Sequence, residues 1–500
     1  MAVTSSEPGA RKIPGQPQLV HSDPRKGVLM YWLLLGGVLI GASLFVIPAP
    51  TGVNPDGWHV LGLLIPIVVI WATEAIPVGV ASLVFLALVV AFHYVTIDIA
   101  FKGFTNHLPW LMLGAFGISA AMERSGLSKR MTYFLLSHLR GFWGLVFAAY
   151  AANTCLMAVP SSAARSGILA PVLSAIMTTI GRPTKSNLSR SLTYNFCNAT
   201  NAFVGDMFLT GGAGNAVMLV LYTTLTGKSL TWIQWLVIMF LPSLIYTFVA
   251  VIGSVMFGRP EPELVEKLRN SKAAQEAYHS LGPMTADEWK VLGAFLLAVF
   301  LWIIGGTIKL DPGLAAVIVM GLLFLPKIGV LPSKALRELN WDITLLIGTA
   351  VGVAGILDQT GMIKVISGAL ISPLLDPLSH FGLIGIAVGC IIVGLIAHFL
   401  LPAPSNLTLA VPLLITWGTS SMHLPTAVVL AFLGILSVLN DKLVMLAYQM
   451  PPYYVYLAMD VTDGPRFNAL LIKLYPILAL ALIVCAFVAY GMIMLTGFGA

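Results

Sequence analysis

The sequence contains few charged residues. Only 10% of its 500 residues are Asp, Glu, Lys or Arg, whereas 58% are hydrophobic, and the mean hydropathy is +0.91. A soluble protein carries roughly 25% charged residues. A chain with so little charge cannot cover a water-facing surface of ordinary polarity. This excludes a soluble globular protein and predicts an integral membrane protein whose partner is the lipid bilayer.

Cysteine is also scarce, with four residues that lie far apart and form no Cys-x-x-Cys pair. Isolated cysteines in apolar surroundings behave as small buried hydrophobic residues, so we expect neither a disulfide framework nor a zinc site. The sequence lacks a Walker-type phosphate loop and paired acids at catalytic spacing. We therefore predict that the protein is not an enzyme and that it binds no cofactor.

The net charge of +6 does not indicate nucleic-acid binding, because Lys and Arg occur in short loops between apolar segments. Such loops precede the first apolar segment (Arg25, Lys26) and recur near Arg182 and Lys185. Basic loops stay in the cytoplasm. We expect a cytoplasmic N-terminus and no nucleic-acid partner.

The sequence contains many long apolar segments. A spanning helix needs about 20 apolar residues, and roughly ten to twelve segments meet that window. Examples are Val28–Ile47, Trp232–Phe257, Val291–Ile308, Leu383–Leu401 and Ile472–Leu495. The predicted fold class is an all-α polytopic membrane protein.

One hydrophilic run lies just past the middle of the chain and divides it. We predict a cytoplasmic tail at 1–27, a first membrane repeat at 28–257, a hydrophilic linker at 258–290 and a second membrane repeat at 291–500.

The two membrane halves resemble each other in sequence. AFGISAAMERSGLSKR (Ala115–Arg130) aligns without gaps to AVGVAGILDQTGMIKV (Ala350–Val365). A second match, PVGVASL from Pro77 with DPGLAAV from Asp311, has nearly the same spacing along the chain. A long-period repeat in a polytopic membrane protein is typical of secondary transporters, in which broken helices from both halves meet at the substrate site.

The first break is LMAVPSSAARSGILAP, Leu156–Pro171. Non-helical backbone in a bilayer is buried in protein or lines a water-filled cavity, so it marks the pathway. Free N–H groups at a half-helix N-terminus favour a carboxylate. We predict that Ser161, Ser162 and Ala163 contact substrate. Arg165 adds positive charge; the alternative is a proline kink in which Arg165 pairs with a nearby acid.

The second break, LLPAPSNLTLAVP (Leu400–Pro412), repeats this chemistry in the second half. Its predicted substrate contacts are Pro404, Ser405, Asn406 and Thr408. His398, just before it, is either a proton relay or a packing histidine.

Two further breaks follow. The third, DMFLTGGAGN (Asp206–Asn215), contains three glycines, and its candidate contacts are Thr210 and Asn215. The fourth, NDKLVMLAYQMPPYY (Asn440–Tyr454), contains Asp441 and Lys442. These charges are costly in an apolar context unless they are paired; the alternative is a surface pair at the end of a loop.

These motifs resemble those of the divalent anion:sodium symporter family. The matching segments are WATEAIP from Trp71, AMERSGLSKR from Ala121, PSSAARSG from Pro160 and MFLTGGAGN from Met207. The last is similar to a run in the branch that holds bacterial citrate/succinate exchangers and plastid 2-oxoglutarate/malate translocators. The resemblance spans nearly the whole chain.

The resemblance implies two inverted repeats, each with a re-entrant hairpin and a discontinuous helix. It also implies an elevator-type transporter, in which a transport domain moves against a scaffold that forms a homodimer. The substrate carboxylates would be held at the two hairpin tips. The expected location is the bacterial cytoplasmic (inner) membrane.

The sequence departs from the family where sodium sites would form. The family's Ser-Asn-Thr is here Ser161-Ser162-Ala163, and its Gly-Thr-Pro-Pro-Asn is reduced to Pro451-Pro452 in the second half. We therefore expect a carrier that exchanges small organic dianions, such as C4-dicarboxylates, 2-oxoacids or citrate, without sodium. The alternatives are a sodium- or proton-coupled symporter of dicarboxylate, or a carrier of an inorganic oxyanion such as sulfate.

Overall fold

The computed structural model describes residues 24–181, 183–401, 405–440, 442–444 and 450–499, and within these ranges the regular elements are all helical. Among the described residues, seven helical stretches are long and apolar enough to cross a membrane: α2 (Pro55–Thr73), α12 (Trp232–Gly258), α15 (Ala286–Ile308), α17 (Trp341–Gln359), Met362–Ser379, α20 (Gly382–Leu400) and α25 (Gly464–Thr496). The all-α polytopic prediction is confirmed.

Shorter apolar helices account for the difference from the ten to twelve expected spans. They are Met30–Ser43 within α1 (Pro24–Ser43), α3 (Val78–Ala91), α11 (Ala213–Thr226), α16 (Pro312–Phe324) and Thr426–Asn440. Many large apolar side chains lie on the outer surface, for example those of Trp32, Phe248 and Leu495, which are well exposed. An apolar exterior of this extent fits lipid rather than water as the surrounding solvent.

Elements of the first half recur in the second half. Helices α3 and α16 begin at residues 78 and 312, and α5 (His107–Ser125) and α17 begin at 107 and 341, so both pairs have the same spacing. Gly126 follows α5 and Gly361 follows α17, both with left-handed φ angles (86° and 73°) that favour glycine. The chain then continues into α6 (Leu127–His138) and α18 (Met362–Ile366). The sequence repeat is therefore a structural repeat.

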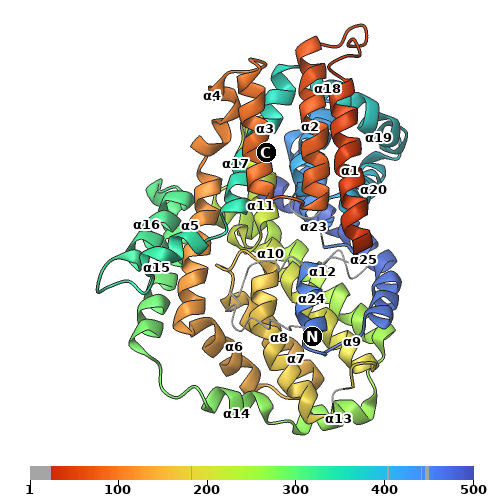
Figure 1. Ribbon diagram of the computed structural model, residues 1–500. Helices are drawn as coiled ribbons and strands as arrows, with labels where there is room; N and C mark the ends of the chain where they lie inside the picture. Colours follow the sequence, from red (N-terminus) through yellow and green to blue (C-terminus); the bar gives the residue numbers. More distant parts are fainter. Residues whose placement is uncertain (1–23, 182, 402–404, 441, 445–449, 500) are drawn as a thin grey trace, which may run out of the picture.

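The repeated elements pack crosswise. Helix α5 of the first half packs against α16 of the second half, and α17 of the second half packs against α3 of the first half. Because α5 corresponds to α17 and α3 corresponds to α16, the two contacts are equivalent. Figure 1 shows α16 beside α5 at the left of the molecule. The long final helices of the two halves, α12 and α25, pack against each other. A two-fold relation between the halves produces this pattern, whereas the inverted sense of the repeat stays a prediction.

Each half contains a helical hairpin and an interrupted helix. The hairpins are α7 (Gly141–Cys155) with α8 (Ser162–Thr179), and α20 with α21 (Ser405–Thr416). The interrupted helices are α9 (Asn187–Tyr194) and α10 (Thr200–Met207) before α11, and α22 (Thr426–Val428) and α23 (Leu436–Asn440) before α24 (Pro451–Ala458). A π-helical turn lies within each, at Asn195–Ala199 and Val429–Ile435. Such turns are frequent at functional sites.

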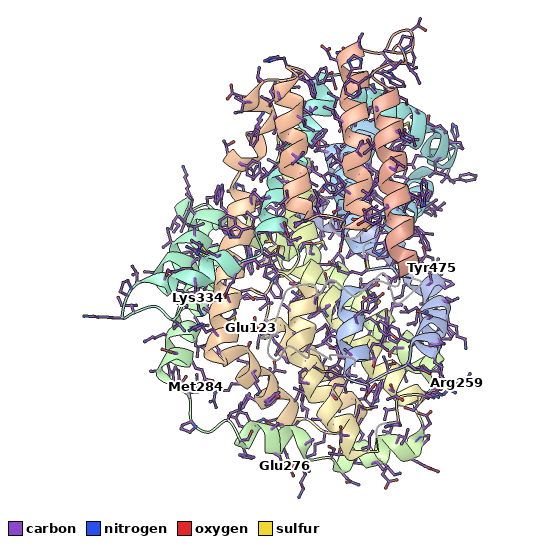
Figure 2. All side chains as sticks on the ribbon, in the orientation of Figure 1. Glu123, Arg259, Glu276, Met284, Lys334 and Tyr475 are labelled. Atoms are coloured by element: carbon purple, nitrogen blue, oxygen red, sulfur yellow. The ribbon has the colours of Figure 1, made fainter. Side chains whose placement is uncertain are left out.

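The hydrophilic linker is folded onto the first half. It contains α13 (Pro262–Asn270) and α14 (Ala273–His279), which lie with α6, α7 and α8 at one end of the molecule (Figure 1). Figure 2 marks this end with Arg259, Glu276 and Met284. Arg130 of α6 donates to Glu288 at 2.7 Å and to the carbonyls of Gly282 and Pro283. The linker therefore has a fixed path into α15.

The remaining regular elements are short. They are α4 (Ile97–Ala100), α19 (Ser372–Ser379), the 3-10 turns Lys102–Thr105, Leu209–Gly211 and Ser333–Glu338, and the π-helical turns Ser367–Ile371 and Trp417–Ser421.

Candidate functional site

The first hairpin tip ends in the open N-terminus of a helix. Helix α7 ends at Cys155 and α8 begins at Ser162, so the non-helical part is shorter than the interrupted stretch in the sequence. Ser161 caps α8, and its Oγ accepts from the backbone N–H of Ala164 at 3.2 Å. Ser161, Ser162 and Ala163 are half-buried. A reachable helix N-terminus of this kind favours an anion.

Arg165 lies one turn into α8 and is 1% exposed. Its Nε donates to Asn201 Oδ1 at 2.9 Å, and its Nη1 donates to the carbonyl of Gly211 at 2.6 Å and to that of Val159. These acceptors lie in the hairpin tip and in the interrupted helix of the first half. The guanidinium therefore ties the tip to the third break and is a cation held at a fixed place.

Asn201 is the centre of a buried polar cluster beneath the tip. Its Nδ2 donates to Ser166 Oγ at 3.1 Å and to the carbonyl of Cys197 at 2.8 Å. Its Oδ1 also accepts from Asn153 Nδ2 at 3.3 Å. The cluster joins α7, α8 and α10, and the Arg165 guanidinium donates to the same Asn201 Oδ1.

The two predicted contacts at the third break both form hydrogen bonds within the protein. Asn215 Nδ2 donates to the carbonyls of Phe208, at 2.8 Å, and Gly205. Thr210 Oγ1 accepts from Trp232 Nε1 at 3.3 Å. A Cβ on Gly211 would lie 2.1 Å from the carbonyl oxygen of Val204, so only glycine permits this close approach. That Thr210 and Asn215 bind substrate stays a prediction.

The second hairpin tip is more deeply buried than the first. Ser405, Asn406 and Thr408 are all buried at the start of α21, and Pro404 lies outside the described residues. Asn406 Nδ2 lies 3.4 Å from His398 Nδ1. The tip therefore stands against the end of α20, and His398 contacts a predicted site residue.

A small cleft separates the second tip from the fourth break. Asn406, Ser437 and Asn440 supply its polar side chains, and the rest of the lining is apolar apart from Gly394. Asn440 Nδ2 donates to the carbonyl of Ile391 at 3.4 Å. Each hairpin tip thus lies against the interrupted helix of its own half.

The interrupted helices also contact each other across the two halves. Lys442 Nζ lies 3.8 Å from Asp206 Oδ1, and the carbonyl of Lys442 accepts from Asn198 Nδ2 at 3.4 Å and from the Tyr246 hydroxyl at 3.2 Å. Lys442 is therefore paired with an acid inside the protein, whereas Asp441 lies outside the described residues.

The second tip reaches the third break as well. The side chain of Leu407 fills the space in front of Gly214, where a Cβ would lie 2.9 Å from Leu407 Cδ1. The structure therefore brings the four breaks together in one region. In the part of the chain that is described, no group of three His, Cys, Asp or Glu side chains is placed to hold a metal ion.

Asp206 and Asn201 lie in this region and were not predicted as site residues from the sequence. Asp206 is a buried carboxylate at the end of α10, and a lone acid in an apolar, glycine-rich run is itself a signal of function. Asn201 carries a weaker signal, because amides also occur as packing groups in helices.

Comparison with known proteins identifies the family. A family model described as the sodium:sulfate symporter transmembrane region matches residues 29–496. The chain belongs to this family. The resemblance to the divalent anion:sodium symporters is thereby confirmed, and the protein is an integral membrane transporter rather than an enzyme.

Individual relatives in the family are named as carriers. The chain is 27% identical to the putative malate transporter YflS of Bacillus subtilis, over 67% of this chain and 71% of the relative. It is 27% identical to the chloroplastic dicarboxylate transporter 1 of Spinacia oleracea, over 66% of this chain and 59% of the relative, less than two thirds of that protein. It is 26% identical to the citrate/succinate antiporter of Escherichia coli, over 68% of this chain and 74% of the relative.

Among solved structures, the YdaH transporter of Alcanivorax borkumensis matches 95% of this chain and 99% of its own at 14% identity, with a TM-score of 0.47.

Proposed function

We propose that the protein is a secondary carrier that exchanges small organic dianions, such as C4-dicarboxylates, 2-oxoacids or citrate, across a membrane. The observation that carries the proposal is the meeting of four helix breaks at a region whose described residues include two cations, Arg165 and Lys442, and one carboxylate, Asp206. The half-buried N-terminus of α8 adds backbone N–H groups that suit a carboxylate. The names of the relatives support an organic anion as the substrate.

Exchange is favoured over sodium coupling by the charges of the site. A dianion needs positive potential, which a sodium symporter obtains from bound ions. In this protein the positive potential comes from the side chains of Arg165 and Lys442. Ser162 and Ala163 occupy the positions at which the sodium-coupled members of the family have an amide and a hydroxyl. A built-in positive charge that remains after the substrate leaves favours binding of a second anion, which is the requirement for exchange.

A thermal-shift screen tests the substrate class. The purified protein in detergent is heated with malate, succinate, 2-oxoglutarate, citrate or sulfate, with sodium or with choline as the cation. We expect stabilisation by one or more of the organic dianions in both cations, because a ligand that binds the folded state raises its stability. Stabilisation by sulfate alone would contradict the organic-anion proposal.

A sodium-coupled carrier of sulfate is the second candidate, because the description of the matched family names both ions. The cleft lined by Asn406, Ser437 and Asn440 offers amide and hydroxyl oxygen atoms, which can coordinate a monovalent cation. Stabilisation by sulfate that occurs in sodium and not in choline would favour this candidate.

The assembly and location follow from the family resemblance. We propose a homodimer with an elevator-type movement, in a bacterial cytoplasmic membrane and with the N-terminus in the cytoplasm. Native mass spectrometry tests the dimer, and a monomer at every detergent concentration would contradict it.

A further inference from the structure

The ion pair between Asp206 and Lys442 joins nearly equivalent places of the two halves. Asp206 lies in the last turn of α10, and Lys442 lies just after the end of α23. The spacing that relates α3 to α16 maps position 206 onto position 440, which ends α23. Residues at equivalent places meet only near the axis that relates the halves. In repeat-built transporters that axis passes the substrate site.

Both cations of the region approach one glycine. A Cβ on Gly205 would lie 3.3 Å from Arg165 Nη2 and 3.8 Å from Lys442 Cε. The missing side chain of Gly205 therefore leaves room for a guanidinium and an ammonium on the same face of α10. Two positive charges this close are costly unless negative charge lies between or beside them.

The two cations are held differently. Arg165 is 1% exposed, and it donates hydrogen bonds to two backbone carbonyls and an amide oxygen. The side chain of Lys442 is 23% exposed, and its Nζ is 3.8 Å from Asp206 Oδ1. Charge-assisted hydrogen bonds between nitrogen and oxygen are about 2.7–2.9 Å long. The side chain of Lys442 is therefore more exposed than that of Arg165, and its contact with Asp206 is longer than an ideal charge-assisted hydrogen bond.

The formal charges of the described residues leave the region one positive charge short of neutralising a dianion. Arg165 and Lys442 contribute two positive charges, and Asp206 removes one. If the ammonium turns from Asp206 to a bound ligand, the ligand faces both cations directly. Lys442 is the one of the two that can turn, because a lysine head lies on a flexible four-carbon stem with three donors.

We propose that Lys442 binds one carboxylate of the substrate, and that Asp206 is a positioning residue that holds the ammonium when no substrate is bound. This inference rests on the proposed function and names a contact within it. Its consequence is selectivity: the second positive charge favours a dianion over the monoanion of similar size.

The test is malate uptake into proteoliposomes loaded with unlabelled malate, with unlabelled lactate as the monoanionic competitor. Lys442→Gln is expected to raise the half-saturation concentration for malate about tenfold or more, because it removes a charge-assisted contact. The preference for malate over lactate should fall by a similar factor. Lys442→Arg keeps the charge and should recover most of the preference.

The double variant Lys442→Gln with Asp206→Asn separates a ligand contact from a structural counter-charge. If Lys442 only neutralises the buried acid, removal of both charges restores the wild-type half-saturation concentration, and the inference is overturned. If Lys442 binds substrate, the double variant keeps the raised value. Lys290→Gln is the matched control, because Lys290 forms an exposed ion pair with Asp287 at 3.2 Å on α15.

Failure of the proposed function gives a different result. Wild-type vesicles would then not exchange malate, malate would not raise the melting temperature of the purified protein, and both proposals would fall. Exchange by the wild type, together with unchanged selectivity in Lys442→Gln, overturns the Lys442 inference alone.

Discussion

The two hairpin tips have the same architecture and different chemistry. Each includes the start of an apolar helix, α8 or α21, and each lies against the interrupted helix of its own half. The first tip is half-buried at Ser161 and Ser162 and is tied down by a buried arginine. The second tip is buried at Ser405 and Asn406, and His398 contacts it.

The two halves place their charged residues in different elements of the repeat. The first half places its cation in the hairpin and its carboxylate in the interrupted helix, whereas the second half places its cation, Lys442, in the interrupted helix. The repeated backbone brings the breaks together, and the departures from exact repetition decide which charges meet there.

The largest expected effect comes from removal of the charge that braces the first tip. Arg165→Met leaves the carbonyls of Val159 and Gly211 and the amide oxygen of Asn201 without this donor. Each unsatisfied buried acceptor costs about 1–3 kcal/mol, so we expect loss of the folded protein, measured by size-exclusion chromatography in detergent. Arg124→Met, at an exposed arginine of α5, is the control. If the two variants yield the same amount of folded protein, Arg165 does not stabilise the first tip.

Glycine substitutions sharpen the comparison within the first half. Gly211→Ala places a methyl group against the backbone of Val204, and overpacking of this kind costs about 1–3 kcal/mol. Gly167→Ala, in α8, meets nothing within 4 Å and should stabilise the helix by about 0.5–1 kcal/mol. Thermal unfolding in detergent should move the two midpoints in opposite directions. A lower midpoint for Gly167→Ala would mean that α8 needs this glycine.

Loss of the helix cap at the first tip is expected to reduce the stability less than the changes at Arg165 and Gly211. Ser161→Ala removes the acceptor of the Ala164 N–H and is expected to cost about 1 kcal/mol. Ser161→Asp keeps a cap and should recover the stability, but its negative charge should weaken malate binding. A melting temperature of Ser161→Ala equal to that of the wild type would contradict the cap.

The smallest expected effect is a pH-dependent contribution of Glu261, in the linker, to the stability of the fold. Glu261 accepts from the backbone N–H groups of Asn187 and Leu188 at 2.8 and 3.0 Å, at the start of α9. Partial burial raises the pKa of Glu261, but these hydrogen bonds, together with the charge of Arg190, outweigh it and lower the pKa below 4.5. The stabilisation is therefore present above pH 4.5 and is lost as pH falls through the lowered pKa.

Glu261→Gln measures this contribution. Since the carboxylate is largely solvated, we expect a loss of less than about 1 kcal/mol at pH 7 that shrinks as the pH falls below 4.5. Melting temperatures of the variant and the wild type across this range provide the measurement. A difference in melting temperature that grows as the pH falls would contradict a lowered pKa of Glu261.

The fold and the four breaks could be predicted from local features of the sequence. Apolar runs interrupted by proline, glycine and serine have few solutions in a bilayer, and the pairing of Gly126 with Gly361 marked the repeat. The partners of Arg165 could not be predicted, because two are backbone carbonyls brought near by packing. The pairing of Asp206 with Lys442 joins the two halves of the chain, and no local pattern selects one partner for either charge.

Counterflow in proteoliposomes tests the central claim most directly. Vesicles that contain the protein are loaded with unlabelled malate or with none, and labelled malate is added outside in choline or in sodium buffer. We predict rapid accumulation only in the loaded vesicles, with equal rates in the two buffers. Uptake that needs external sodium and proceeds without internal dicarboxylate would contradict exchange.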